Sequence, residues 1–434
     1  MRTPLLLLFL LCTTGLSAQS WQPLVNAPNL IGPLSKLDDV HFINASTGWT
    51  ISSQGKVFKT EDGGENWQEQ ADLNEFLRCV KFANEDVGYV GSLMGSFGGP
   101  PSNARIFKTE DGGASWTDLT AAISPEPIGI CGLSVVDEQT VYGCGAFYGP
   151  ARVYKSLDGG ASWTTIDLSG LATNVVDLHF FTADFGFVIG AGTTPTSGGV
   201  ILRTEDGGAN WEVVHNTMVP SDLLWKIQAL DEDHLYAAIA GVSMVNGARI
   251  LVSEDGGASW TSRLVAAGEI HLQGLGFISP ERGFAGGFFE GLYETRDGGA
   301  SWEQILVGAN YNRFQKINDS LMYASGHTIY AFSDSSDIMT STAEILAPPS
   351  YSMTVAPNPA SDQFRISYTL QNPTHLQLRL YDTQGKIVQT FFEGWHPGGE
   401  FQVDAAIGQL PAGMYIVGFL SREGDILQKV LIEK

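Results

Sequence analysis

Basic residues, cysteine and helix-type patterning are all scarce in this 434-residue chain. The 24 Lys and Arg face 47 Asp and Glu, a formal charge of −23, which argues against nucleic acid and anionic membrane surfaces as partners because both select a basic footprint. No Cys and His residues have the spacing of a metal site, and we expect neither a metal nor a cofactor. Helical periodicity is weak and the 51 glycines favour an all-β chain, long enough for two or more domains.

The start of the chain has the features of a secretory signal peptide. Met1-Arg2 precedes the apolar run Leu5–Leu11 and the small residues Ser17-Ala18. The run is too short for a stable bilayer anchor. We therefore predict a signal peptide over residues 1–18 and no transmembrane segment after its removal. Cys12 raises a lipoprotein alternative, but a lipobox needs a small residue in the preceding position, which is Leu here.

Three cysteines remain after removal of the signal peptide, namely Cys79, Cys131 and Cys144. If Asp137-Glu138 form a turn, Cys131 and Cys144 face each other on adjacent strands, where a disulfide is geometrically allowed. Three buried free thiols are the alternative.

One octamer occurs six times and organises the middle of the chain. Each copy has Ser or Thr, Asp two residues later, then Gly-Gly, and Trp three residues after the second Gly. The copies are Thr60–Trp67, Thr109–Trp116, Ser156–Trp163, Thr204–Trp211, Ser253–Trp260 and Thr295–Trp302. Short β-branched or aromatic runs flank each copy, which is typical of a hairpin. Regular recurrence at this distance indicates a propeller or another repeat array.

The residue types of the octamer suit a tight turn. The Gly pair supplies positive φ, Asp accepts turn N–H groups, the hydroxyl holds Asp in place, and Trp covers the turn. No copy has the D-x-D-x-D-G oxygen ligands of a calcium loop. We therefore expect structural roles for Asp62, Asp111, Asp158, Asp206, Asp255, Asp297, Trp67, Trp116, Trp163, Trp211, Trp260 and Trp302.

These octamers resemble the Asp box (BNR repeat) of sialidases, sortilin-type receptors and xyloglucanases. They are more similar still to the T-x-D-G-G-x-x-W variant of the photosystem II assembly factor-like propellers. In those families the box is a structural turn far from the active face. The resemblance therefore implies a β-propeller in which none of the six Asp residues is catalytic.

A second pattern lies upstream of the boxes and completes the repeat. An aromatic residue is followed six residues later by Gly and a second aromatic residue, as in Phe42…Gly48-Trp49 and Phe180…Gly186-Phe187. This second hairpin gives four antiparallel strands per repeat, which is the propeller blade. We predict seven blades over 19–335, the last one closed by the N-terminal strand Trp21–Leu24, with six or eight blades as alternatives.

The last 85 or so residues differ in sequence pattern from the repeats, because they contain no box. Residues 336–350 are predicted to be a linker, and short strands with regular turns over 351–434 favour a small Ig-like β-sandwich. Three landmarks there resemble the C-terminal (Por) sorting domain of the type IX secretion system: Pro357, Asn358, Pro359, Gly385, Leu410, Pro411, Gly413 and Tyr415. The resemblance implies recognition by that machinery and passage through the periplasm of a Bacteroidetes-type bacterium to the cell surface or medium. An accessory Ig-like domain is the alternative.

The loops between the second and third strands of each repeat are candidates for a ligand surface, because function concentrates on loops of a rigid scaffold. At the loop exits Lys56, Arg105, Arg152 and Arg249 each precede a box Trp by 11 residues, and the loops carry Phe97, Phe147 and Tyr148. We predict an arc of cations and aromatic groups that binds anionic groups; solvated charges paired with neighbouring Asp or Glu are the alternative. His41, Lys81, His179 and Gln228 are expected to line the central channel.

No catalytic set can be assembled from the sequence. A sialidase-like enzyme needs an Arg triad, a Tyr nucleophile with a Glu partner and an Asp acid/base, and a xyloglucanase needs a carboxylate pair between two propellers. The sequence therefore favours an exported, non-catalytic module that binds a glycan or a protein. A glycoside hydrolase or lyase and a structural adhesion component are the alternatives.

Overall fold

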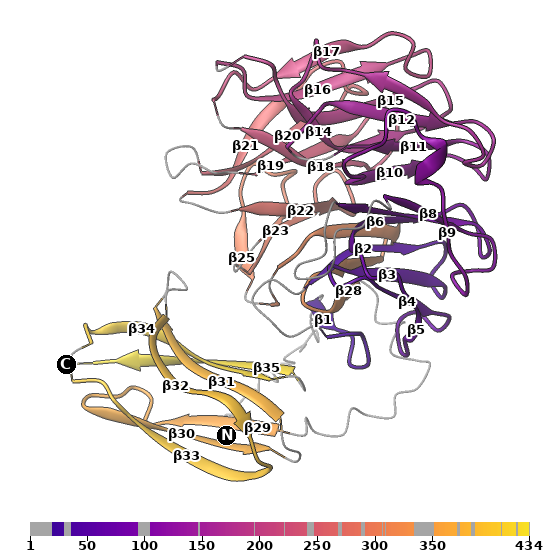
Figure 1. Cartoon of the computed structure of the whole chain (residues 1–434). Helices are drawn as coiled ribbons and strands as arrows, with labels where there is room; N and C mark the ends of the chain where they lie inside the picture. Colours follow the sequence, from indigo (N-terminus) through magenta and orange to yellow (C-terminus); the bar gives the residue numbers. More distant parts are fainter. Residues whose placement is uncertain are drawn as a thin grey trace, which may run out of the picture.

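The computed structural model describes residues 20–433, except 30–35, 94–104, 146–147, 195, 221, 241–246, 268–270, 288–290, 306, 309, 334–350, 371–373, 383–386, 409 and 422–423. The predicted signal peptide, the predicted linker, Phe97, Phe147 and Gly385 lie outside the described residues. The described chain is all-β apart from one 3-10 turn, η1 (Thr120–Ala122), as the sequence predicts (Figure 1).

Between residues 20 and 333 the described strands form seven four-stranded antiparallel sheets, which we number 1 to 7. Sheet 1 contains β2 (Leu37–Phe42), β3 (Gly48–Ser52), β4 (Lys56–Thr60) and β5 (Gln68–Asp72). Sheet 2 contains β6 (Phe76–Phe82), β7 (Gly88–Leu93), β8 (Ile106–Thr109) and β9 (Thr117–Asp118). Sheet 3 contains β10 (Gly132–Val135), β11 (Val141–Cys144), β12 (Arg152–Ser156) and β13 (Thr164–Asp167).

The remaining sheets follow the same order of strands. Sheet 4 contains β14 (Asn174–Phe180), β15 (Gly186–Ala191), β16 (Gly199–Thr204) and β17 (Glu212–Asn216). Sheet 5 contains β18 (Leu223–Ala229), β19 (Leu235–Ala240), β20 (Ala248–Ser253) and β21 (Thr261–Ala266). Sheet 6 contains β22 (Leu272–Phe277), β23 (Gly283–Gly287), β24 (Leu292–Thr295) and β25 (Glu303–Ile305). Sheet 7 contains β26 (Arg313–Asn318), β27 (Leu321–Ser325), β28 (Ile329–Ser333) and β1 (Ser20–Pro23).

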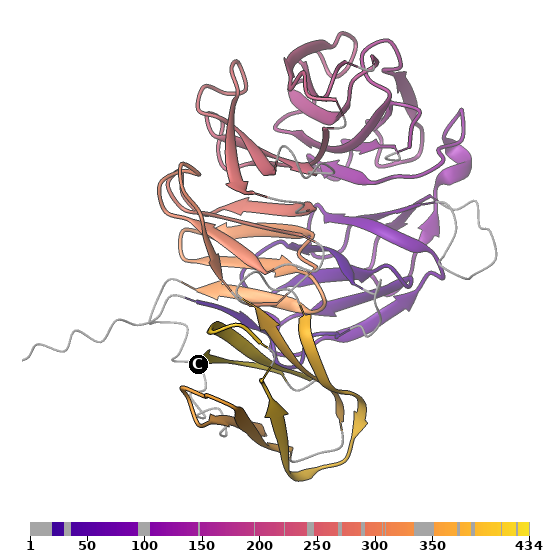
Figure 2. The same cartoon turned by 90° about the vertical axis from the view of Figure 1, so that its left-hand side faces the viewer.

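The first strand of every sheet faces a common centre. These inner strands contact one another in the order β2, β6, β10, β14, β18, β22 and β26, and β26 returns to β2. The N-terminal strand β1 is the outer strand of sheet 7, with Trp21 paired to Phe332, so the two ends of the repeat region lie side by side (Figures 1 and 2). Trp21 also makes edge contacts with Phe284 and Phe314. The result is a closed propeller around a central channel.

The aromatic pattern of the sequence forms the cores between neighbouring sheets. Phe82 of sheet 2 stacks on Trp49 of sheet 1 with ring centroids 3.5 Å apart, and Phe180 of sheet 4 stacks on Tyr142 of sheet 3 at 3.6 Å. Gly48 opens β3 because a Cβ there would lie 2.5 Å from the ring of Phe42. The spacing of aromatic, glycine and aromatic therefore encodes ring stacking between sheets.

Each Asp box closes a hairpin between the third and fourth strands. In sheet 2, Thr109 Oγ1 donates to Asp111 Oδ1 (2.8 Å) and accepts from Gly113 N (2.8 Å), while Trp116 Nε1 donates to the carbonyl of Gly113 (3.0 Å). Gly112 N donates to the carbonyl of Asp86, in the turn between the first two strands. Box turns and first-hairpin turns therefore share one end of the channel, and the loops between the second and third strands lie at the other.

The C-terminal residues form a separate β-domain with its own core, which includes Phe364, Leu378 and Phe419. One sheet contains β29 (Tyr351–Ala356), β30 (Gln363–Leu370) and β33 (Gly399–Ala406). The other contains β32 (Ile387–His396), β31 (Thr374–Asp382), β34 (Gly413–Ser421) and β35 (Gly424–Ile432). Asn358 Oδ1 accepts the N–H of Leu431 (2.8 Å), which ties the Pro-Asn-Pro landmark to the last strand.

Candidate binding site in the propeller channel

Two of the predicted loop-exit cations are paired within their own sheets. Lys56 Nζ lies 2.8 Å from Glu69 and 2.9 Å from Asp72, both on the neighbouring strand β5. Arg249 Nη2 donates to both carboxylate oxygens of Asp222, at 2.6 and 2.8 Å. These side chains therefore match the alternative of charges paired with neighbouring carboxylates rather than an arc that is free for a ligand.

The other members of the predicted arc that the structure describes differ from one another in exposure. Arg105 is only 2% exposed, and Arg152 lies opposite Asp167 in the register of β12 and β13. Tyr148 is half-exposed at 50%. Sequence spacing alone missed this outcome because it gives the strand on which a cation lies but not the neighbouring carboxylates.

Cys79, Cys131 and Cys144 are buried and none of them forms a disulfide, which corrects the possible Cys131–Cys144 disulfide. In the register of β10 and β11, Gly132 lies opposite Cys144, so Cys131 is displaced by one residue from the position that would face it. Within the described residues, no group of three His, Cys, Asp or Glu side chains is placed to hold a metal ion.

The structure places a cavity of about 410 Å³ in the channel, at the end of the inner strands where the box turns lie. Seven residues pair in register with the aromatic residue of the second strand in each sheet, and all of them except Gly276 line this cavity. We call these positions the mouth ring: His41, Lys81, Ser134, His179, Gln228, Gly276 and Gln315. The expected channel-lining residues His41, Lys81, His179 and Gln228 are thus all equivalent, and all four line the cavity.

Several mouth-ring side chains join one sheet to the next. His41 Nδ1 accepts the N–H of Phe82 (3.1 Å), and Ser134 Oγ accepts the N–H of Phe180 (3.0 Å). Gln228 accepts from and donates to the backbone of Phe277, and Gln315 does the same with Phe42. These groups satisfy backbone polar groups at the sheet boundaries, so they are part of the scaffold as well as of the cavity wall.

Two residues further along each inner strand, away from the mouth, lies a second layer. We call it the inner ring: Asp39, Cys79, Gly132, Asp177, Lys226, Gly274 and Arg313. Arg313 Nε donates to Asp39 Oδ1 (3.0 Å) and its Nη1 to Asp177 Oδ2 (3.1 Å), which links sheets 7, 1 and 4 across the channel. Lys81 Nζ lies 3.8 Å from Asp39.

Both inner-ring carboxylates are held ionised. Burial raises the pKa of Asp39, but Arg313, Lys81 and Lys226 outweigh it and bring the pKa down to about 2. The pKa of Asp177 is also lowered, because Arg313 and Lys226 outweigh its burial. Burial lowers the pKa of His41 to about 3, with Lys81 adding to the effect, and lowers that of His179 to about 4. The channel therefore holds anionic Asp and neutral His at pH 7.

Towards the opposite end of the channel, a third layer of buried charge follows. Asp38 pairs with Arg78, whose guanidinium lies 5.7 Å from the ring centroids of both Phe76 and Trp225. Lys36 Nζ donates to Gln273 Oε1 (2.7 Å) and lies 3.5 Å from Asp38. Phe76 and Trp225 belong to an apolar cluster with Leu93, so large side chains fill this part of the channel.

The charged inner ring is the part of the site that sequence reasoning missed. A signal was present, since sheets 1 and 4 both carry Asp-x-His-Phe, as Asp39–Phe42 and Asp177–Phe180. No sequence signal pointed to Arg313, because its sheet has no box and its two partners, Asp177 and Asp39, lie 136 and 274 residues away in sequence.

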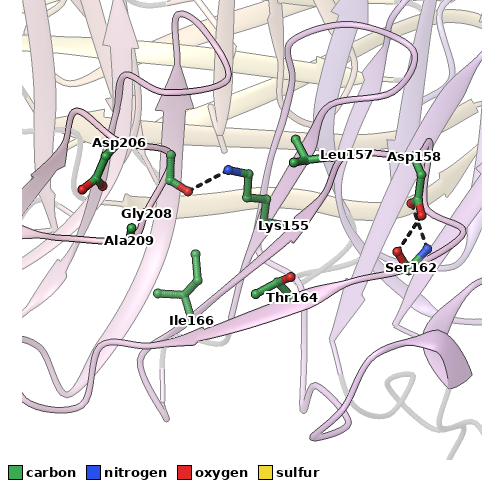
Figure 3. A pocket seen from close by; sticks show the side chains of 10 residues that line it. Lys155, Leu157, Asp158, Ser162, Thr164, Ile166, Asp206, Gly208 and Ala209 are labelled. Carbon is green, nitrogen blue, oxygen red and sulfur yellow. Dashed lines mark hydrogen bonds between the residues drawn. The ribbon is translucent and has the colours of Figure 1, made fainter.

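A second cavity of about 410 Å³ lies between the box turns of sheets 3 and 4 (Figure 3). Lys155 Nζ donates to the carbonyl of Gly207 in the next box turn (3.0 Å), and Asp158 is held by Ser162. Leu157 is 58% exposed at its edge, in the position where four of the other five boxes carry Glu. This groove belongs to the seam between two scaffold turns.

Comparison with known families agrees with this architecture. Residues 354–433 match the family described as the secretion system C-terminal sorting domain, and residues 18–148 match that of the photosynthesis system II assembly factor YCF48. The chain joins a YCF48-like propeller to a secretion sorting domain. This sorting domain directs the propeller through the type IX secretion system to the cell surface or medium. Within the described residues, no helix has the length and apolar character to cross a membrane.

Solved structures share the fold of the YCF48-like propeller. "YCF48 bound to D1 peptide" is 17% identical with a TM-score of 0.55 and covers 74% of this chain and 99% of its own. YCF48 from Cyanidioschyzon merolae is 17% identical with a TM-score of 0.53, covering 72% and 98%. The WD40 propeller of Doa1 is 14% identical with a TM-score of 0.53, covering 74% and 99%. A search of curated proteins found no match.

Proposed function

We propose that the exported propeller is a non-catalytic binding module that receives a segment of a protein partner at the mouth ring. The observation that carries this proposal is the cavity of about 410 Å³, whose polar lining differs from sheet to sheet. A wall built from His41, Lys81, His179 and Gln228 offers both hydrogen-bond donors and acceptors in fixed positions. Such a wall suits selective recognition of a polar chain.

The carboxylates of the channel argue against a glycosidase. A glycoside hydrolase needs one carboxylic acid with a raised pKa and a second carboxylate that is free to act as a base or nucleophile. Asp39 and Asp177 both have lowered pKa values, and both are bound to Arg313. Neither is suited to protonate a leaving group, which favours binding without turnover.

Two observations favour a protein segment over a glycan. Four of the aromatic rings that pair with the mouth ring stack on a ring of the next sheet rather than lying flat towards a sugar, namely Trp49, Tyr142, Tyr236 and Tyr323. A propeller of the same fold has been solved as YCF48 bound to a D1 peptide. His179 and Lys81 are the mouth-ring groups best placed to contact a segment, because neither caps the backbone of the next sheet in the described hydrogen bonds.

The test is to screen the full chain against a peptide array from cell-envelope proteins and, in parallel, a glycan array. His179→Ala and Lys81→Met are compared with Lys56→Ala, a matched control at the opposite end of the channel. We expect selected peptides to bind and both mouth-ring variants to lose at least about tenfold in affinity, or about 1.4 kcal/mol. Glycan binding in place of peptide binding, or equal losses in the Lys56→Ala control, would contradict the proposal.

A further inference from the structure

The middle of the channel contains more cations than anions. In the mouth ring, the inner ring and the third layer, the cationic side chains are Lys36, Arg78, Lys81, Lys226 and Arg313, and the carboxylates are Asp38, Asp39 and Asp177. Each carboxylate already has a cation within 4 Å: Asp38 has Arg78 and Lys36, Asp39 has Arg313 and Lys81, and Asp177 has Arg313. The surplus is notable because the whole chain carries a formal charge of −23.

Lys226 is the cation in this network that has no carboxylate partner among the described residues. Its side chain belongs to the inner ring and is buried, at 2% exposure. Its Nζ makes no hydrogen bond with any described residue, and no described carboxylate oxygen is paired with it within 4.0 Å. The inner-ring positions on either side are Asp177, which Arg313 already occupies, and Gly274, which has no side chain to offer.

A buried ammonium group without a partner costs several kcal/mol. Either the group gives up its proton, or an anion from outside the chain balances it. Burial and the charge of Arg313 lower the pKa of Lys226, whereas Asp177 and Asp39 oppose that shift. Arg313 lines the mouth cavity together with Ile227 and Gln228, the two residues that follow Lys226 on β18, so the wall of the cavity continues directly from the Lys226 position.

We propose that the propeller channel binds a small monovalent anion on the ammonium group of Lys226. The ion would enter from the mouth cavity past Arg313 and balance part of the surplus positive charge. The monovalent anion could come from two sources. One is a free ion the size of a halide, and the other is the carboxylate of a chain terminus inserted from the mouth. The buried ion is expected with or without a protein partner at the mouth ring.

The first test is the melting temperature of the full chain as sodium fluoride, chloride, bromide or acetate replaces sodium sulfate at constant ionic strength. For a bound anion at 100 times its Kd we expect a rise on the order of 5 °C. Lys226→Met should abolish the rise, since Met fills similar volume without charge. Lys108→Met is the matched control, because Lys108 pairs with Glu110 outside the channel, and this variant should keep the wild-type response.

The second test separates the sources and does not depend on the variant folding. Wild-type crystals soaked in sodium bromide should show an anomalous peak beside Lys226 Nζ. A tripeptide of alanine with a free C-terminal carboxylate is then compared with its C-terminal amide as a competitor of bromide. Competition by the acid alone would show that the site accepts a chain terminus, and a bromide peak without competition would show a buried free ion. An absent bromide peak, or an anion response that Lys226→Met retains, would overturn the proposal.

Discussion

The rim and the channel of this propeller follow opposite rules. At the rim, six Asp boxes repeat the same hydrogen bonds, as the pairs Thr60–Asp62 and Thr295–Asp297 show at 2.8 and 2.9 Å. In the channel, the seven inner-ring positions hold five residue types, and Arg313 joins two aspartates from different sheets. The box turns repeat because each of these six sheets has to close the same tight hairpin between its third and fourth strands. Variation at equivalent positions gives the channel a chemistry that none of its repeats has alone.

Sheet 7 differs from the other six sheets because it has no Asp box. The outer position that a post-box strand fills in the other sheets is taken by β1, and Trp21 is buried there against Phe284, Phe314 and Phe332. Where the local turn is lost, closure of the ring therefore depends on one large side chain near the start of the described chain.

The largest effect is expected from Trp21→Ala. Removal of a buried Trp costs about 3–5 kcal/mol, and here it also loosens the strand that closes the ring. Denaturant unfolding should show a lower midpoint, with Trp163→Ala as the control, since Trp163 covers a box turn and is only partly buried. A smaller loss in Trp21→Ala than in the box variant would contradict the role of β1 in closure.

Arg313→Gln should be almost as damaging. The substitution leaves Asp39 and Asp177 buried without their main cation, and breaking a buried ion pair in this way costs about 3–5 kcal/mol. Arg203→Gln is the matched control, because Arg203 pairs with Glu205 and Glu212 at the surface and should cost only about 0–1 kcal/mol. Equal midpoints for the two variants in urea would show that the channel network adds no stability.

Changes at one box should be milder. Thr109→Val removes a hydroxyl that accepts the N–H of Gly113 in a buried position, which costs about 1–3 kcal/mol. Asp158→Ala should likewise lower the melting temperature, and neither variant should change the affinity of the folded protein for a ligand at the mouth ring. A large loss of affinity at an unchanged melting temperature would overturn the structural role of the boxes.

The contrast between local turns and long-range channel contacts explains which parts of the structure could be predicted from the sequence. The boxes, the Phe…Gly-aromatic pattern and the Pro-Asn-Pro landmark are local, so they predicted the all-β propeller and the sorting domain. The channel is built from residues far apart in sequence: Arg313 meets Asp39 across 274 positions. No spacing rule reports such a contact, because it depends on closure of the ring. For the same reason the spacing predicts an arc of loop-exit cations that binds anionic groups, whereas Lys56 and Arg249 are paired with carboxylates.

The channel histidines give the smallest and most specific prediction. Burial lowers the pKa of His41 to about 3 and of His179 to about 4, below the ordinary value of 6.5. Between pH 6.5 and 4 the unfolded chain therefore binds more protons than the folded chain, so the free energy of unfolding falls as the pH falls. The two histidines together should cost roughly 1 kcal/mol between pH 7 and 6. His179→Gln should remove about half of that pH dependence in urea titrations, and an unchanged pH dependence would show that His179 is not held neutral by the channel.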